Sequence, residues 1–389
     1  MAAAVQDARG DRVSSPTHPA DTFPQLDRGG LRLKPLSERK NKVHFPADAV
    51  DPASAPRPLP PAGAATLAET VQRIRDARAS GKPVMCAFGA HTIKNGLGPV
   101  LVRLIQQGWI THLATNGAGI IHDWELAYQG QTSEDVRANV RVGEFGTWDD
   151  TGRCINLALL VGAWRGLGYG QSVGAFIAEE GTEIPSAQEL AAEVRRLAET
   201  DPGRAAAAAD LLAAVKQQAL PPGRLRVSHP FARYSAQAAA WSARVPFTGH
   251  PMIGHDIIYE HPLNSGSAVG RTALTDFLVF AEGVSRLDGG VYLSVGSAVM
   301  SPMIFEKSLS MARNVALQEG RTIDRHFMLV VDLAASTWDW QKDGEPPATD
   351  PAYYLRYCKT FSRMGGTMRY LQADNRDFFL SMVRQLSVP

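Results

Sequence analysis

Residues 82–125 carry the pattern that most constrains how this chain folds. A short apolar run at residues 83–88 ends at Gly89, and apolar residues between positions 100 and 105 then recur with helical spacing. A second apolar run at residues 113–115 leads into a glycine-rich turn at residues 116–119. Strand, helix and strand in this order make a βαβ unit with parallel strands. The stretch predicts an open α/β sheet with a ligand site at the carboxyl ends of its strands, where both glycine turns lie.

The glycines of these two turns have two interpretations. Gly89, Gly117 and Gly119 either make tight turns only, or let the backbone approach a phosphate or a sugar closely. Their spacing is not G-x-G-x-x-G, so the general dinucleotide pattern is missing. Two such turns, the second followed directly by His122 and Asp123, favour a functional site.

Composition excludes several classes of partner. The chain has 389 residues, of which 44% are hydrophobic and 20% charged, with a net charge of +1. This balance gives no electrostatic reason to expect nucleic acid or a membrane as partner. The cysteines, Cys86, Cys154 and Cys358, lie far apart, fit no zinc spacing and predict reduced thiols in a cytoplasm. No metal is expected, and no apolar run has the length of a membrane helix.

Residues 1–63 are poor in apolar side chains and predict a flexible N-terminal arm, followed by a single large domain over residues 64–389. Residues 36–43 are an exception that is either a solvated basic tail or a segment that packs on a neighbouring subunit. Capping-box patterns at residues 66–69 and 186–189 predict the starts of two helices. Strands and helices then alternate to the end of the chain, which predicts a Rossmann-like, mostly parallel sheet with helices on both faces.

A loop at residues 249–262 holds the densest group of polar side chains in the chain. It contains His250, His255 and His261 together with Asp256 and Glu260. Histidines five and six residues apart on an irregular loop match no common metal site. A substrate or acid/base role for His255 or Asp256 is the favoured interpretation.

Four segments resemble motifs of the deoxyhypusine synthase family, in the same order along the chain. Residues 115–123 are similar to T-A-G-G-x-E-E-D, residues 235–247 to S-x-x-x-W-A-x-x-x-x-I-P-V-F, residues 289–291 to G-G-G-V and residues 370–374 to V-Y-A-D. The likeness covers most of residues 65–389. It implies a Rossmann-like sheet that binds NAD and a homotetramer with sites at subunit boundaries. The cofactor residues it implies, together with the first glycine turn, are Gly89, Thr115, Asn116, Gly117, Gly119, Asp123, Gly289, Gly290 and Asp374.

The chain also departs from that family. The W-G-K signature is missing, and no histidine follows the glycine-rich strand in residues 294–303. Lys359 lies in the corresponding region and is either a surface lysine or the lysine that takes the product as an imine. We therefore expect an NAD-dependent transferase or oxidoreductase that acts on a small amine or polyol, not on the family's own substrate. The alternative is a phosphosugar- or nucleotide-binding protein, isomerase-like or regulatory, that holds phosphate at Gly296 and Ser297.

Two expectations about geometry follow. The turns at Gly89, at residues 117–119 and at residues 289–290 are expected to form one crevice at the carboxyl edge of a single sheet. The pair His255 and Asp256 is expected to face the same cavity as the pair His122 and Asp123, with Lys359 as the further catalytic candidate.

Overall fold

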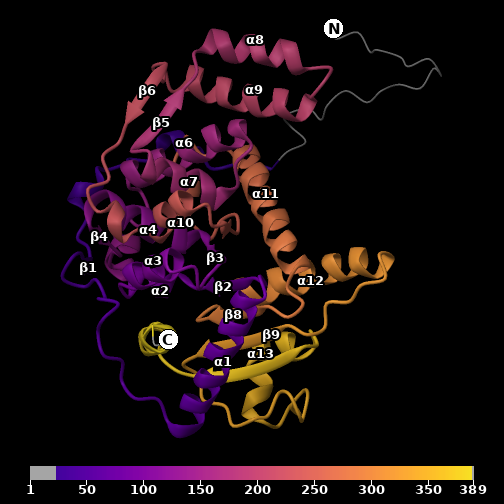
Figure 1. Ribbon diagram of the computed structural model, residues 1–389. Helices are drawn as coiled ribbons and strands as arrows, with labels where there is room; N and C mark the ends of the chain where they lie inside the picture. Colours follow the sequence, from indigo (N-terminus) through magenta and orange to yellow (C-terminus); the bar gives the residue numbers. More distant parts are fainter. Residues whose placement is uncertain (1–22, 388–389) are drawn as a thin grey trace. The chain divides into compact units, whose positions relative to one another are not determined.

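The computed structural model describes residues 23–387, and its large compact unit begins at Leu33. A six-stranded parallel sheet forms the centre of this unit (Figure 1). Its strands are β2 (Val84–Phe88), β3 (His112–Asn116), β7 (Phe247–His250), β8 (Val291–Val295), β9 (Phe327–Asp332) and β10 (Thr367–Gln372). The predicted α/β class with a mostly parallel sheet is confirmed.

The strand order, β10-β9-β8-β2-β3-β7, reverses direction once. The chain runs outward from β2 through β3 to β7, then returns to place β8 on the other side of β2 and continues to β9 and β10. This is the doubly wound order in which the crevice lies where the direction reverses, between the first and fourth strands. Here that position is the carboxyl ends of β2 and β8.

Both faces of the sheet are buried, as the apolar strands predict. Val84, Cys86 and Phe88 of β2 belong to one hydrophobic core, whereas Met85 and Ala87 belong to a second. The alternation follows from the two-residue repeat of a strand. Helices fill in around the sheet as follows: α1 (Pro61–Ala79), α2 (Ala90–Lys94), α3 (Gly98–Gln106), α4 (Gly117–Gln129), α5 (Val136–Val142), α6 (Asp149–Arg165), α7 (Tyr169–Ala178), α8 (Ala187–Leu197), α9 (Pro202–Gln217), α10 (Ala236–Ala243), α11 (Gly266–Ser285), α12 (Met300–Gln318), α13 (Arg356–Ser362) and α14 (Asn375–Leu386).

Helices α8 and α9 form a helical hairpin (Figure 1). Ser186 and Glu189 make the predicted capping box at the start of α8. The capping box expected at residues 66–69 is wrong, because α1 begins at Pro61 and the Thr66 hydroxyl bonds the Ala62 carbonyl inside the helix. Two short hairpins complete the secondary structure: β1 (Val43–His44) with β4 (Gln131–Thr132), and β5 (Gly181–Ile184) with β6 (Gly223–Arg226).

The segment that follows Leu33 differs most from the sequence-based expectation. The sequence predicts the boundary between arm and domain at residues 63 and 64, whereas the large compact unit of the structure begins at Leu33. Leu36, Phe45 and Val50 are buried in the main core, and β1 pairs with β4 of the same chain. Residues 36–43 are thus neither a solvated tail nor a segment free to pack elsewhere. For residues 1–22 the expected flexible arm lies outside the described residues.

No helix in residues 23–387 is both long enough and apolar enough to cross a bilayer.

Candidate active site

A cavity of about 180 Å³ lies at the carboxyl edge of the sheet, beside β3 and β7. Three of the predicted catalytic residues line it: His122 from α4, and His255 and Asp256 from the loop after β7. The structure thus brings the two predicted polar segments to one cavity. Further charged residues on its wall are Arg39, Lys94, Glu125 and Glu134.

Asp256 is the most perturbed of the predicted residues in this cavity. Its carboxylate packs on the first residue of α4, where a Cβ added to Gly117 would come within 2.0 Å of Asp256 Oδ2. Asp256 Oδ2 is buried and has no hydrogen-bond partner within residues 23–387. Burial raises the pKa of Asp256 to about 7, so this carboxyl group is suited to exchange a proton near neutral pH.

His255 lies beside Asp256 but is exposed. Its exposure separates it from Asp256, whose Oδ2 is buried.

Arg39 and Glu125 form a buried ion pair in the wall of the cavity. The guanidinium donates to both carboxylate oxygens, with Nη1–Oε1 at 2.8 Å and Nη2–Oε2 at 2.6 Å, and the two side chains are 2% and 1% exposed. Two hydroxyl groups complete the shell of Glu125: Thr151 donates to Oε1 and Thr132 to Oε2. The Arg39 guanidinium and these hydrogen bonds oppose the effect of burial and lower the pKa of Glu125, which is therefore ionised.

His122 is linked to this ion pair through Thr132. Its Nδ1 lies 2.8 Å from the Thr132 hydroxyl oxygen. Burial lowers the pKa of His122 to about 4, so its imidazole is neutral at physiological pH.

Asp123 does not face the cavity with its neighbour His122. It is 1% exposed, and its carboxylate accepts hydrogen bonds from the Ser235 hydroxyl and from the backbone amides of Ala236 and Gln237. These contacts fix the start of α10, so the expectation that Asp123 shares the cavity is wrong.

The reversal point of the sheet holds Gly89 and Gly296, the residues that follow β2 and β8. A Cβ added to Gly89 would come within 2.1 Å of the Gly296 carbonyl oxygen, so only glycine permits this approach of the two turns. The side chains nearest to these turns are polar. Asn375 Nδ2 donates to the Thr92 hydroxyl, and it lies 2.8 Å from the position that a Cβ on Gly296 would take.

Residues 117–119, which were predicted to be a second glycine turn, form the first turn of α4 and are closely packed. A Cβ added to Gly119 would come within 2.2 Å of Thr115 Oγ1, which itself donates to the Phe88 carbonyl. Asn116 caps α4, with its side-chain oxygen accepting from the Gly119 amide. Thr115 and Asn116 therefore shape the turn between β3 and α4 in the structure.

Gly289 and Gly290 precede β8 and lie at its amino end, where Gly290 accepts from the Phe327 amide. In a parallel sheet this is the edge opposite to the turns at Gly89 and Gly117. The expected single crevice that included all three turns is therefore wrong.

Asp374 and Lys359 lie at the β10 side of the sheet. Asp374 follows β10 and caps α14 through the Arg376 amide. Lys359 on α13 pairs with Glu345 and lies over the Tyr353 ring. It does not line the cavity with His122, and β10 stands four strands away from β3 in the sheet, roughly 19 Å at the usual strand spacing. Its side chain is 15% exposed and held in an ion pair, so Lys359 is neither a solvated surface lysine nor part of the cavity that holds His122.

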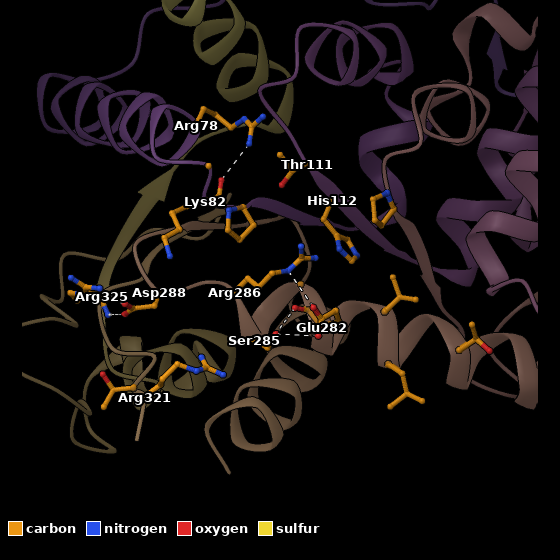
Figure 2. Close-up of a pocket in the computed structure, with 18 residues that line it drawn as sticks. Arg78, Lys82, Thr111, His112, Glu282, Ser285, Arg286, Asp288, Arg321 and Arg325 are labelled. Atoms are coloured by element: carbon orange, nitrogen blue, oxygen red, sulfur yellow. Dashed lines mark hydrogen bonds and ion pairs between the residues drawn. The ribbon is translucent and has the colours of Figure 1, made fainter. Parts of the chain in front are cut away.

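A larger cavity, of about 1130 Å³, opens at the amino edge of the sheet (Figure 2). Its cationic side chains come from segments at or after the ends of α1, α11 and α12: Arg78, Lys82, Arg286, Arg321 and Arg325. Cations are expected there, because the carbonyl ends of helices carry partial negative charge. Figure 2 also shows Arg325 paired with Asp288 and Arg286 paired with Glu282. Arg321 pairs with Glu319 and Arg78 donates to the Gly108 carbonyl, so four of the five cationic side chains have partners within the protein.

Sequence reasoning missed the charged residues of the cavity wall, Glu125, Lys94, Arg39 and Glu134, and also Thr132 behind them. Glu125 follows His122 by three residues on a helix. This spacing places both side chains on one face, so the sequence does indicate that Glu125 lies near His122. Lys94 follows the first glycine turn, where a site was already expected. Arg39 and Thr132 gave no signal, because their role depends on contacts with α4 made by segments far from each other in sequence.

Comparison with protein-family models and with curated proteins gives no match. Among solved structures, the chain is similar to a candidate LOR/SDH protein from Methanococcus maripaludis S2, with 12% identity over 86% of this chain and 72% of that chain and a TM-score of 0.44. It is also similar to AgrE in a ternary complex with ornithine and NAD+, with 14% identity over 83% of this chain and a TM-score of 0.40; the match spans 33% of the AgrE chain. A candidate deoxyhypusine synthase from Entamoeba histolytica matches with 7% identity over 83% of this chain and 88% of that chain and a TM-score of 0.38. All three TM-scores lie below 0.5.

Proposed function

We propose that the protein is an NAD-dependent enzyme that oxidises a small amine or polyol at the carboxyl-edge cavity. One observation carries the proposal: Asp256, with its buried and unpartnered Oδ2 and a pKa near 7, lies in a cavity at the carboxyl edge of a doubly wound sheet, beside β3 and β7. A carboxyl group in this state is suited to general acid/base chemistry.

The strand order supports the cofactor, because doubly wound sheets of this order bind dinucleotides at the reversal point. Beside that point Thr92 is 0% exposed and accepts from Asn375. Asn375, which is 9% exposed, and Lys94 on the same helix as Thr92 are the residues that would hold the cofactor. Two features of the dinucleotide fingerprint are missing: the three-glycine spacing, and an acid at the end of the second strand, where Asn116 stands. Bound NAD+ would supply a hydride acceptor.

The residues of the chain supply the proton chemistry and the selection of substrate. A cavity of about 180 Å³ has room for a small molecule only. Asp256 would take the proton from the substrate's hydroxyl or amine group as its carbon loses a hydride. Lys359 does not line this cavity. The proposed reaction therefore uses acid/base chemistry by Asp256 and no imine on Lys359.

Binding and turnover test the two halves of the proposal separately. Titration of the purified protein with NAD+ should raise its melting temperature, because a ligand that binds only the folded state stabilises it. Absorbance of reduced cofactor is then followed with a panel of small amines and polyols. Asp256→Asn should bind NAD+ normally and lower turnover by about 100-fold or more.

Normal turnover by Asp256→Asn would reject Asp256 as the acid/base group. Stabilisation by sugar phosphates and not by NAD+ would favour the alternative of a phosphosugar-binding protein. That alternative has less support in the structure, since the Ser297 hydroxyl already accepts from the Ser301 amide in the first turn of α12.

We also propose that the protein assembles as a homotetramer. Apolar side chains near the cavity support an interface there: Val136, which lines the cavity, is 53% exposed, and Val140 and Ile253 are 58% and 73% exposed. Light scattering should give a mass four times that of the chain, and a monomer with full activity would contradict the proposal.

A further inference from the structure

The hydrogen bonds around Thr132 determine which nitrogen of His122 carries its proton. A hydroxyl group has one hydrogen to donate. The Thr132 hydroxyl lies 2.5 Å from Glu125 Oε2, and an ionised carboxylate only accepts, so the hydrogen of Thr132 goes to Glu125. The Thr132 oxygen must then accept from His122 Nδ1, which lies 2.8 Å away.

We propose that His122 is held as its Nδ1–H tautomer and presents the lone pair of Nε2 to the cavity as a fixed hydrogen-bond acceptor. Thr132, Glu125 and Arg39 are the positioning residues, because each one sets the hydrogen-bonding role of the next. Nε2 has no hydrogen-bond partner within residues 23–387 and is therefore available to a ligand.

Arg39 is the origin of this chain of interactions. Its two donated hydrogen bonds keep Glu125 ionised although the carboxylate is buried. A protonated Glu125 would be able to donate to Thr132 instead, and the Thr132 hydrogen would then be free to turn towards His122. The cation from the N-terminal segment thus fixes the tautomer of a histidine on α4 without contacting it.

The fixed acceptor defines the class of ligand group that fits beside it. His122 Nε2 is an acceptor that lines the cavity without a partner within residues 23–387, so the ligand atom that meets it must be a donor. An amine or a hydroxyl group meets this requirement, and a carboxylate or phosphate does not. This step rests on the proposed function, whereas the tautomer of His122 does not.

The tautomer is measured directly by NMR on protein labelled with 15N-histidine, without cofactor or substrate. Long-range 1H–15N correlations distinguish a protonated ring nitrogen from an unprotonated one. Ten histidines contribute, and the signals of His122 are those that vanish in His122→Asn. At pH 7 we expect a protonated Nδ1 and an unprotonated Nε2. The opposite tautomer, or an averaged mixture, would overturn the proposal whether or not the protein binds NAD.

Two substitutions of Thr132 test its positioning role. Thr132→Ser retains the hydroxyl group and should leave the His122 spectrum unchanged. Thr132→Val retains the shape without the hydroxyl and should shift His122 towards the Nε2–H tautomer that free histidine favours in water. An unchanged spectrum in a folded Thr132→Val protein would show that Thr132 does not set the tautomer. If that variant does not fold, the wild-type and Thr132→Ser spectra still decide the tautomer.

The ligand class is tested with ethanolamine, which carries both an amine and a hydroxyl group, and with acetate as the anionic control. Ethanolamine should shift the His122 Nε2 signal in a saturable way, and acetate should not. A shift by acetate, or no shift by ethanolamine, would overturn the assignment of the cavity to donor groups. Neither result depends on NAD binding, so failure here and failure of the proposed function can be told apart.

Discussion

Replacing Arg39 with methionine should cost far more stability than its place in a basic N-terminal segment indicates. The variant leaves the Glu125 carboxylate, 1% exposed, without its two hydrogen bonds from Arg39. Removal of one partner from a buried ion pair costs about 3–5 kcal/mol. We expect the lower part of this range, because Thr132 and Thr151 continue to donate to Glu125.

A second substitution separates the uncompensated charge from lost packing. Glu125→Gln in the Arg39→Met background removes the negative charge and retains a side-chain oxygen as acceptor. The double variant should be more stable than Arg39→Met alone by at least about 1 kcal/mol, since a buried group without its partner is more costly than a neutral one. In the wild-type background the same Glu125→Gln change should be destabilising.

Urea unfolding at pH 7 measures these differences as changes in the transition midpoint at constant slope. Arg321→Met is the matched control, because Arg321 pairs with Glu319 where both side chains are more than half exposed, and such a pair contributes about 0–1 kcal/mol. A loss below about 1 kcal/mol for Arg39→Met, or a further loss on adding Glu125→Gln, would refute this account of the ion pair.

Two further predictions concern buried carboxyl groups. In Gly117→Ala the new methyl group should displace the Asp256 carboxylate into water and reduce turnover as much as Asp256→Asn does. Circular dichroism should show that the helix is intact. The control variant Gly266→Ala, at the open start of α11, should have no effect on turnover. Burial raises the pKa of Asp276 to about 7 from an ordinary value of 3.8, so the folded state retains a proton that the unfolded state loses, and stability falls as pH rises from about 4 to 7. Between these pH values the free energy of unfolding of the wild type should fall by about 4 kcal/mol relative to that of Asp276→Asn. Denaturant melts measure both free energies as a function of pH, and parallel profiles for the two proteins would disprove this prediction.

The local elements of the fold were determined by the sequence itself. The βαβ unit at residues 82–125, the α8–α9 hairpin and the later strands all follow from short-range patterns of apolar residues, glycines and caps. The predicted convergence of His122 with Asp256 also follows from sequence, because residues after parallel strands meet at one edge. The same rule places Gly289 at the opposite edge of the sheet, because it precedes its strand.

Only the tertiary structure decided the wall of the cavity. Nothing local in residues 33–50 indicates burial, and Arg39 stands in a polar, basic run. Its position depends on β1 pairing with β4, which brings Arg39 and Thr132 onto the same carboxylate of α4. Whether a charged side chain is solvated or buried depends on the partner that meets it in space. That partner, Glu125, lies 86 residues away, beyond the range of any periodicity or cap.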